Sequence, residues 1–187
     1  PDDIVNEYGA DTLRLYEMFI GDFEKSAPWS PQGIKGCRRF LERVDSLKEL
    51  VKGTGVTPKL EASFHKTIKK VTEDIDSMKF NTGVAALMSL LNEIYDYGSL
   101  TKEEFETFIL LLCPYAPHLC EELWESLGHK DLASLAKWPE YDESKTVEST
   151  VEIAVQVLGK LRGTITINVG EDKDSVIEKA KNDEKIK

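Results

Sequence analysis

The sequence predicts a mainly α fold, in which a helical bundle is followed by a small, truncated α+β module. Apolar residues recur every three or four positions through most of the first 127 residues, which is the spacing of amphipathic helices. Glycine and proline separate the helical segments. An alternation with a period of two begins only after residue 146, where it indicates strands. We therefore expect connecting helices at residues 1–29, a bundle at residues 30–145 and the partial module at residues 146–187.

Three helices are expected before residue 52. Residues 2–9 form a short helical turn, and residues 10–20 form a second helix with Leu13, Tyr16 or Glu17, and Ile20 at helical spacing. The third helix runs from residue 31 to about residue 51, because Ser30 can cap it and Pro31 suits its first position. Its inward stripe is predicted to hold Phe40, Leu41, Val44, Leu47, and Leu50 or Val51.

Four more helices complete the predicted bundle. Residues 60–77 and 81–97 each carry one apolar stripe. The next helix begins at Thr101, which forms a capping-box pattern with Glu104. A proline-rich turn then leads into a helix over residues 116–127. The loop that follows contains Trp138, which we expect to pack it onto the bundle.

The last part of the chain predicts a β-hairpin and a helix. Two alternating segments flank the turn signal Gly159-Lys160, and an amphipathic helix is expected at residues 174–185. One hairpin and one helix bury little apolar surface, so this piece is marginal alone. The apolar positions of the alternation are Val151, Ile153, Val155, Val157, Ile165, Ile167 and Val169.

The chain is acidic, with a net charge of −10. Residues 146–187 hold seven basic and eight acidic residues, so nine of the ten net negative charges fall before residue 146. Dedicated nucleic-acid-binding domains are usually basic, but a local basic row on an acidic body can still meet phosphates. No apolar run reaches the roughly 20 residues that span a bilayer. The chain opens with Pro1 rather than Met, so we expect a piece of a longer protein.

The three cysteines are expected to be reduced, and Cys113 and Cys120 are expected to lie in the core. Cys37, Cys113 and Cys120 are odd in number and form no CxxC pair, which favours a reducing, cytoplasmic setting over a disulfide framework. The three tryptophans, Trp29, Trp124 and Trp138, could stack on bases, although Trp124 has the spacing of a core residue.

The best candidate site is a basic row on the third helix. Lys35, Arg39 and Arg43 recur every four residues and therefore share one helix face, with Arg38 beside them. Guanidinium groups fork onto phosphate oxygens, so this row could grip one strand of a nucleic acid. The alternative is a solvated face with internal ion pairs, such as Arg39 with Glu42. A second candidate is the hairpin turn, where Lys160 and Arg162 could meet phosphate; a simple soluble hairpin tip is equally compatible with that pattern.

No catalytic or metal site is expected. The sequence contains no GxSxG, HExxH or P-loop motif. His118 lies between Cys113 and Cys120, but this order lacks a zinc-site spacing. An alternative reading is an enzyme that uses His118 with Glu121 or Glu122.

Five segments carry a resemblance to a known family. They are residues 1–30, 34–44 (IKGCRRFLERV), 80–93 (FNTGVAALMSLLNE), 111–125 (LLCPYAPHLCEELWE) and 151–167 (VEIAVQVLGKLRGTITI). Together they resemble the C-terminal region of bacterial-type leucyl-tRNA synthetases, in the class I aminoacyl-tRNA synthetase family. The first segment is similar to the stretch directly after that family's KMSKS loop. Several strings are shared with valyl and isoleucyl enzymes, but the GKLRG hairpin favours leucine.

The resemblance implies a bundle of the anticodon-binding-domain type that docks leucine-specific tRNA against the catalytic domain of the same parent chain. The parent would use ATP and Mg²⁺, whereas this region lacks the HIGH-type and KMSKS signatures and is expected to be inactive and to bind no cofactor itself. We expect a cytoplasmic monomer without membrane contact. Carried onto this sequence, tRNA contacts fall on Lys35, Arg38, Arg39, Arg43, Lys160 and Arg162, and Arg14 would brace the linker to the catalytic domain.

Two positions depart from the family pattern. Asp45 stands where an aromatic residue is expected, and Leu158 stands where an asparagine is expected. Two alternative identities therefore stay open: the equivalent region of a valyl- or isoleucyl-type synthetase, and a helical protein-interaction module.

Overall fold

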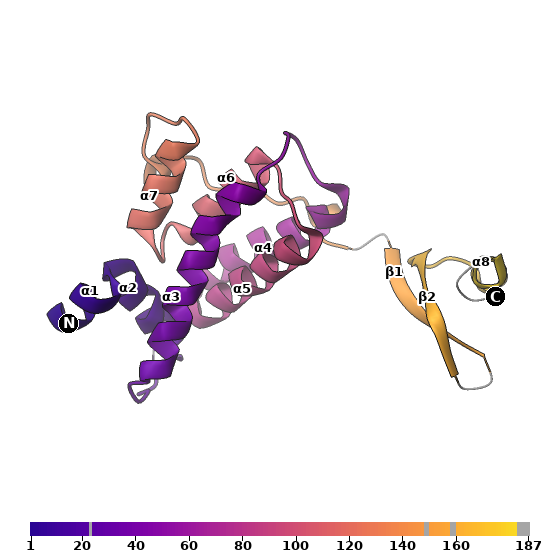
Figure 1. Ribbon diagram of the computed structural model, residues 1–187, viewed down its shortest axis with the longest axis horizontal. Helices are drawn as coiled ribbons and strands as arrows, with labels where there is room; N and C mark the ends of the chain where they lie inside the picture. The colour runs from indigo at the N-terminus through magenta and orange to yellow at the C-terminus, as the bar shows by residue number, and fades with distance from the viewer. Residues whose placement is uncertain (23, 148–149, 158–159, 183–187) are drawn as a thin grey trace. The chain divides into compact units, whose positions relative to one another are not determined.

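The computed structural model describes residues 1–22, 24–147, 150–157 and 160–182, and the chain divides into two compact units (Figure 1). Pro1–Thr146 is helical, and Val147–Lys187 contains a hairpin and a helix. The predicted mainly α class is therefore confirmed.

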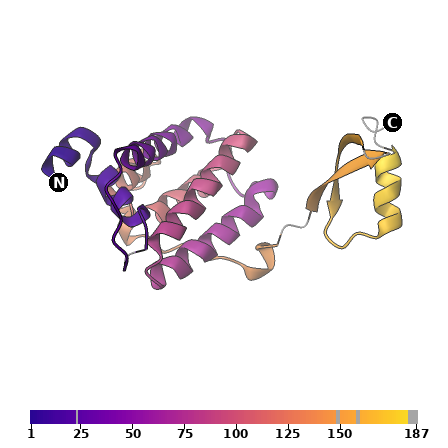
Figure 2. The same cartoon turned by 90° about the horizontal axis from the view of Figure 1, so that it is seen from below.

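The first unit is a bundle of helices joined by turns and loops. Its α-helices are α1 (Asp2–Tyr8), α2 (Ala10–Phe19), α3 (Pro31–Ser46), α4 (Pro58–Asp76), α5 (Phe80–Tyr97), α6 (Lys102–Leu112) and α7 (Pro117–Ser126). Three 3₁₀ turns, η1 (Leu47–Leu50), η2 (Ala133–Leu135) and η3 (Glu143–Lys145), lie in the connections. α4 and α5 pack against each other as an antiparallel pair, seen side by side in Figure 2.

Local signals fix where several helices begin. The Ser30 hydroxyl accepts a hydrogen bond from the Gly33 amide at 3.1 Å, so the predicted cap of α3 is confirmed. Thr101 and Glu104 form the predicted capping box at the start of α6. Buried apolar residues from α2 to α7 then merge into one continuous core.

Glu104 also ties two segments of the bundle together. Its side chain is 5% exposed. One carboxylate oxygen accepts from the Thr57 amide at 2.6 Å, and the other accepts from the Thr57 hydroxyl at 2.9 Å and the Thr101 amide at 2.8 Å. This single side chain therefore holds the turn before α4 against the start of α6.

α3 is shorter than the sequence predicts. The α-helix ends at Ser46 and tightens into η1, whereas the apolar stripe suggested a helix to about residue 51. A long-range pairing ends the helical stretch after Leu50: Val51 forms a parallel bridge with Leu100, and the Lys52 amide donates to the Leu100 carbonyl at 2.8 Å. Extended backbone at Val51 cannot continue a helix.

α2 is buried more deeply than its predicted stripe implies. Leu15 and Tyr16 are both essentially inaccessible to solvent, while Leu13 and Ile20 are only partly buried. α3 covers one side of α2, and α5 and α7 contact others, so more than one stripe is enclosed.

The second unit pairs β1 (Thr150–Val157) with β2 (Lys160–Asn168), followed by α8 (Lys173–Asn182). The strands are antiparallel, and the register shifts between Val155 and Gln156. Val155 lies opposite Gly163 and Gln156 lies opposite Leu161, so Arg162 is the extra residue of a β-bulge. Lys160 is paired within β2 rather than placed in the turn, and Gly159 lies outside the described residues.

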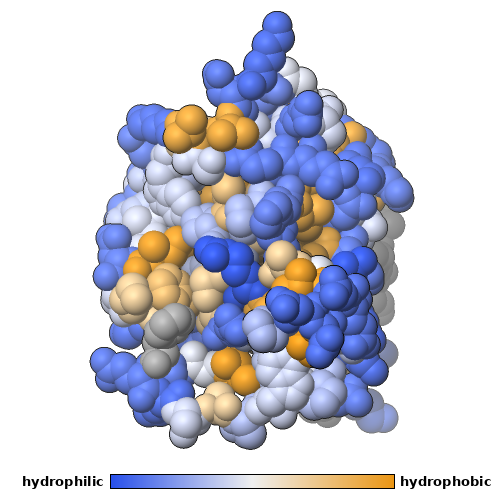
Figure 3. Space-filling model, turned by 90° about the vertical axis from the view of Figure 1, so that its left-hand side faces the viewer, coloured by the Kyte–Doolittle hydropathy of each residue, from blue (hydrophilic) through white to orange (hydrophobic). Residues whose placement is uncertain are grey.

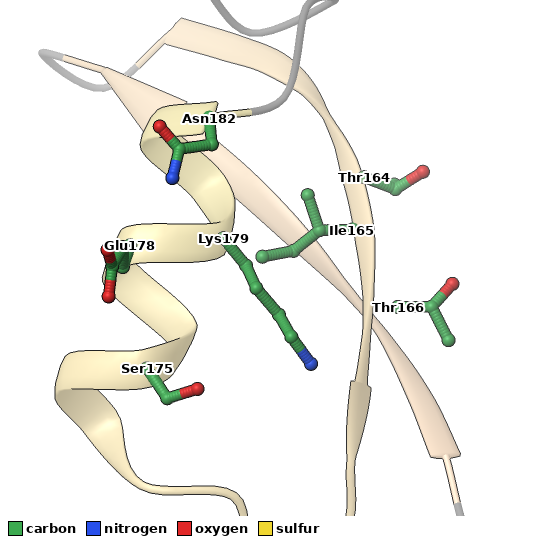
Figure 4. A pocket seen from close by; sticks show the side chains of 7 residues that line it. All are labelled: Thr164, Ile165, Thr166, Ser175, Glu178, Lys179 and Asn182. Carbon is green, nitrogen blue, oxygen red and sulfur yellow. The ribbon is translucent and has the colours of Figure 1, made fainter.

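α8 and β2 border an open hollow of about 580 Å³ (Figure 4). Ile165 points from β2 towards α8, and Lys179 extends from α8 into the space between them. Thr164 and Thr166 point away from the helix. Because Ile165 is 7% exposed, it supplies the apolar contact between helix and hairpin.

Candidate nucleic-acid interface

The solvent side of α3 carries the predicted basic row. Ile34, Cys37, Phe40, Leu41 and Val44 form the buried side of this helix. Lys35, Arg38 and Arg39 are therefore on its solvent side and are exposed, and Arg43 is partly buried. The four cations share a helix but have different surroundings.

Lys35 and Arg39 are the most available members of the row. Both are exposed, and neither has a carboxylate partner among the residues that the structure describes. They lie four residues apart, which places them one above the other at about 6 Å along the helix axis. Two cations in this arrangement can each meet an anionic oxygen of the same extended ligand.

Arg38 is engaged within the chain. Its Nε donates to the Glu42 carboxylate at 2.8 Å, and its NH1 nitrogen donates to the Tyr8 carbonyl at 3.0 Å. The guanidinium thus joins the end of α1 to α3. An internal ion pair with Glu42 is therefore present, but it is formed by Arg38 and not by Arg39, which the sequence suggested.

Arg43 is held against an aromatic ring. Its guanidinium carbon lies 4.7 Å from the centre of the Tyr95 ring, a cation–π arrangement. The Tyr95 hydroxyl also donates to the Arg43 carbonyl at 2.8 Å. Arg43 therefore anchors α5 to α3, and a ligand would meet a guanidinium whose one face is already occupied.

Lys160 and Arg162 are exposed in the second unit, and no carboxylate partner is found for them among residues 150–157 and 160–182. The bulge at Arg162 breaks the alternation of β2, so their spacing of two does not by itself place them on one face.

Arg14 supports the turn between α6 and α7. Its NH2 nitrogen donates to the Pro114 carbonyl at 2.9 Å. Arg14 also borders a cavity of about 300 Å³, lined further by Leu110, Cys113, Pro117 and Trp138 among others. This guanidinium therefore stabilises the proline-rich turn from the side of α2.

A clasp that the sequence does not reveal joins α2 to the start of α7. The Asp11 carboxylate is 11% exposed and accepts from the Leu119 amide at 2.7 Å and the His118 amide at 3.3 Å. It also lies 2.8 Å from His118 Nδ1. A carboxylate at a helix N-terminus is favourable both as a cap and towards the helix dipole. Asp11 and His118 are 107 residues apart, so the sequence alone does not reveal this contact.

His118 and Glu121, which the alternative enzyme hypothesis uses, have structural partners. His118 is 78% exposed and bound to Asp11, while Glu121 accepts from the amides of Ala133 and Ser134 at 2.6 and 2.9 Å. These contacts give His118 and Glu121 different partners. Within the described part of the chain, no three His, Cys, Asp or Glu side chains converge as a metal site would require.

The cysteines and two of the tryptophans belong to the core. Burial raises the pKa of Cys37 and of Cys113 to about 11, and raises the pKa of Cys120 well above its usual value. Trp124 is buried, and Trp138 Nε1 donates to the Thr72 hydroxyl at 2.8 Å, so the predicted packing of its loop onto the bundle is confirmed.

Figure 3 shows the face that lies on the left-hand side in Figure 1. This face is mostly hydrophilic, with apolar side chains in small separate patches. No helix within the described residues is both long and apolar enough to cross a membrane. Polar contacts, rather than burial of a broad apolar area, are what this face offers a partner.

Comparison with known proteins supplies the family. Residues 59–178 match the model described as the anticodon-binding domain of tRNA ligase. The chain is similar to the leucine–tRNA ligase of Alkaliphilus oremlandii (strain OhILAs), with 55% identity over all 187 residues, and spans 23% of that protein's length. It is also similar to the synthetase in the ternary complex of Agrobacterium radiobacter K84 agnB2 LeuRS-tRNA-LeuAMS. That match has a TM-score of 0.72 and 28% identity, and covers 100% of this chain and 27% of the other.

The family model covers well over half of the sequence and reaches from α4 into α8. The helical bundle, its exposed cations and this match agree with one another. The chain belongs to the family of anticodon-binding domains of tRNA ligases.

Proposed function

We propose that this chain binds and positions leucine tRNA as part of a leucine–tRNA ligase. The observation that carries the proposal is the 55% identity to such a ligase along the entire chain, from α1 through α8. A relative of known structure with the same fold was solved together with tRNA. Valyl- and isoleucyl-type enzymes remain the alternative identity, and the tRNA preference distinguishes them.

Lys35 and Arg39 are the main contacts of the proposed binding surface, because neither is paired with a carboxylate among the described residues. Arg43 contributes from its place on Tyr95, and Lys160 and Arg162 add contacts from the second unit. Arg38 can add to the local potential, but its donors already serve Glu42 and Tyr8.

In the whole ligase, leucine would be joined to tRNA with ATP and Mg²⁺ at a catalytic domain outside this sequence, and the complete protein would act in the cytoplasm. This chain would supply no catalytic group. Arg14 and the turn that it supports at Pro114 would face that catalytic domain. The proposal requires no cofactor in the region itself.

Fluorescence anisotropy with labelled leucine tRNA tests the proposal directly. Binding should weaken steeply as salt rises, because phosphate contacts release counterions. Replacing both Lys35 and Arg39 with Gln should lower affinity and reduce the slope of log K against log salt by roughly 1 to 2. A tRNA of another specificity should bind less tightly than leucine tRNA.

The matched control replaces two other exposed lysines, Lys52 and Lys59, with Gln, which removes the same charge from another part of the first unit. This control should keep nearly the wild-type affinity. If the wild-type chain does not bind leucine tRNA even at low salt, the proposed function is wrong. If both double variants weaken binding equally, the assignment to α3 is wrong.

A further inference from the structure

Gly36 is an unexplained glycine in the middle of an exposed helix surface. It lies in α3, between Lys35 and the turn that carries Arg39. Glycine is the least favourable residue in a helix interior apart from proline. A glycine at such a position therefore needs a reason.

Packing within the described chain does not supply that reason. Apart from its two chain neighbours and the adjacent backbone of its own helix, a Cβ atom built at Gly36 meets no atom within 4 Å. Two other helical glycines behave differently: a Cβ at Gly33 would lie 2.7 Å from the Tyr16 ring, and a Cβ at Gly83 would lie 2.5 Å from the Tyr115 hydroxyl. Those two glycines are required by their neighbours, and Gly36 is not.

The surroundings of Gly36 are basic in an otherwise acidic chain. No acidic residue occurs from residue 26 to residue 41, and the first one in α3 is Glu42, which Arg38 neutralises. Arg39 lies three residues beyond Gly36 and is its neighbour on the helix surface, and Lys35 lies four residues before Arg39 on the same face. A partner approaching Gly36 would meet positive charge and bare backbone.

An exposed tryptophan, Trp29, comes just before α3 in the sequence and packs against Tyr16. Trp29 is 49% exposed, and its ring packs edge-on against Tyr16 with ring centres 4.9 Å apart. Tyr16 is itself fixed, because its hydroxyl accepts from the Ser30 amide at 2.6 Å under the first turn of α3. An exposed indole held at its edge can stack on an unpaired base with little further ordering.

We infer that an RNA backbone lies directly against the N-terminal half of α3 at Gly36. Lys35 and Arg39 contact its phosphates, and Trp29 offers a stacking surface to a neighbouring base. This inference rests on the proposed tRNA-binding function and adds to it the point of closest approach. Close approach of a polymer backbone is one of the situations that favour glycine over any residue with a side chain.

The test separates folding from binding at one residue. Gly36→Ala should raise the melting temperature by a few degrees, roughly 2–4 °C, since alanine is a better helix former and meets no clash. The same change should weaken leucine-tRNA binding, and Gly36→Leu should weaken it by about tenfold or more because the larger side chain holds the phosphates away. Trp29→Leu should also weaken binding, whereas Trp29→Phe should retain most of it.

The matched control is Ala85→Leu, which adds similar bulk to an exposed position in α5 and should leave affinity unchanged. Wild-type affinity in Gly36→Leu would overturn the inference while leaving the proposed function intact, provided that the wild-type chain binds. Loss of binding in both Gly36→Leu and Ala85→Leu would also overturn it, because bulk alone would then explain the effect.

Discussion

Removal of the Glu104 side chain should be among the most damaging single changes in the bundle. Glu104→Ala leaves three donors without their acceptor: the Thr57 amide, the Thr57 hydroxyl and the Thr101 amide. Thr57 and Thr101 are both buried, so water reaches these groups poorly. At about 1–3 kcal/mol for each buried group left unsatisfied, and allowing for partial relaxation, we expect a loss of roughly 3–5 kcal/mol.

Urea denaturation followed by far-UV circular dichroism measures this loss. Glu104→Gln keeps the shape and one acceptor oxygen and should lose about half as much. The control is Glu103→Ala, since Glu103 is exposed and accepts only from the Gly55 amide among the contacts described for its carboxylate. It should cost about 1 kcal/mol or less. If Glu104→Ala proves no more harmful than this neighbour, the argument that buried donors depend on Glu104 fails.

Three further outcomes follow from buried groups. Gly83→Ala should destabilise by about 1–3 kcal/mol because the new methyl meets the Tyr115 hydroxyl, and Tyr115→Phe should rescue much of that loss in the double variant; additive unfolding energies would contradict this contact. Native Cys37 should react slowly with iodoacetamide at pH 8 and quickly in denaturant, because burial raises its pKa to about 11; rapid labelling of the native chain would argue against burial. Burial opposes ionisation of Glu121, but hydrogen bonds from Ser134 and Ala133 leave its pKa below the usual value. Its contribution to stability should therefore be full above the unfolded-state pKa of roughly 4.3 and fade as pH falls through the lower folded pKa. The stability gap between wild type and Glu121→Gln should narrow over that acidic range; a constant gap would refute the assignment.

Local rules explain why much of the bundle is readable from sequence. The cap at Ser30 and the capping box at Thr101 involve residues three apart, so their partners are known once the helix is known. The alternation around Ile153 and Ile165 likewise predicts the hairpin, although not its register, which contains a bulge at Arg162. These features depend on spacing along one element.

Features that depend on distant segments escaped the sequence. The helical stretch that begins with α3 ends at Leu50 because Val51 pairs with Leu100, and the helical apolar pattern gives no sign of that bridge. Arg38 donates to the backbone carbonyl of Tyr8. Because every residue has a backbone carbonyl, the sequence does not show which one will accept this hydrogen bond. Gly36 could be noticed in sequence, but only the structure shows that nothing in the described chain approaches it.

The Asp11 clasp bears on where this protein can be cut for expression. The matched family segment begins at residue 59, yet the cap of α7 comes from α2. A shortened chain starting at residue 59 would lose that cap and would uncover the core surface that Leu15 and Tyr16 occupy. Boundaries drawn from sequence similarity alone would therefore give an unstable product, and recombinant fragments should retain the helix that carries Asp11.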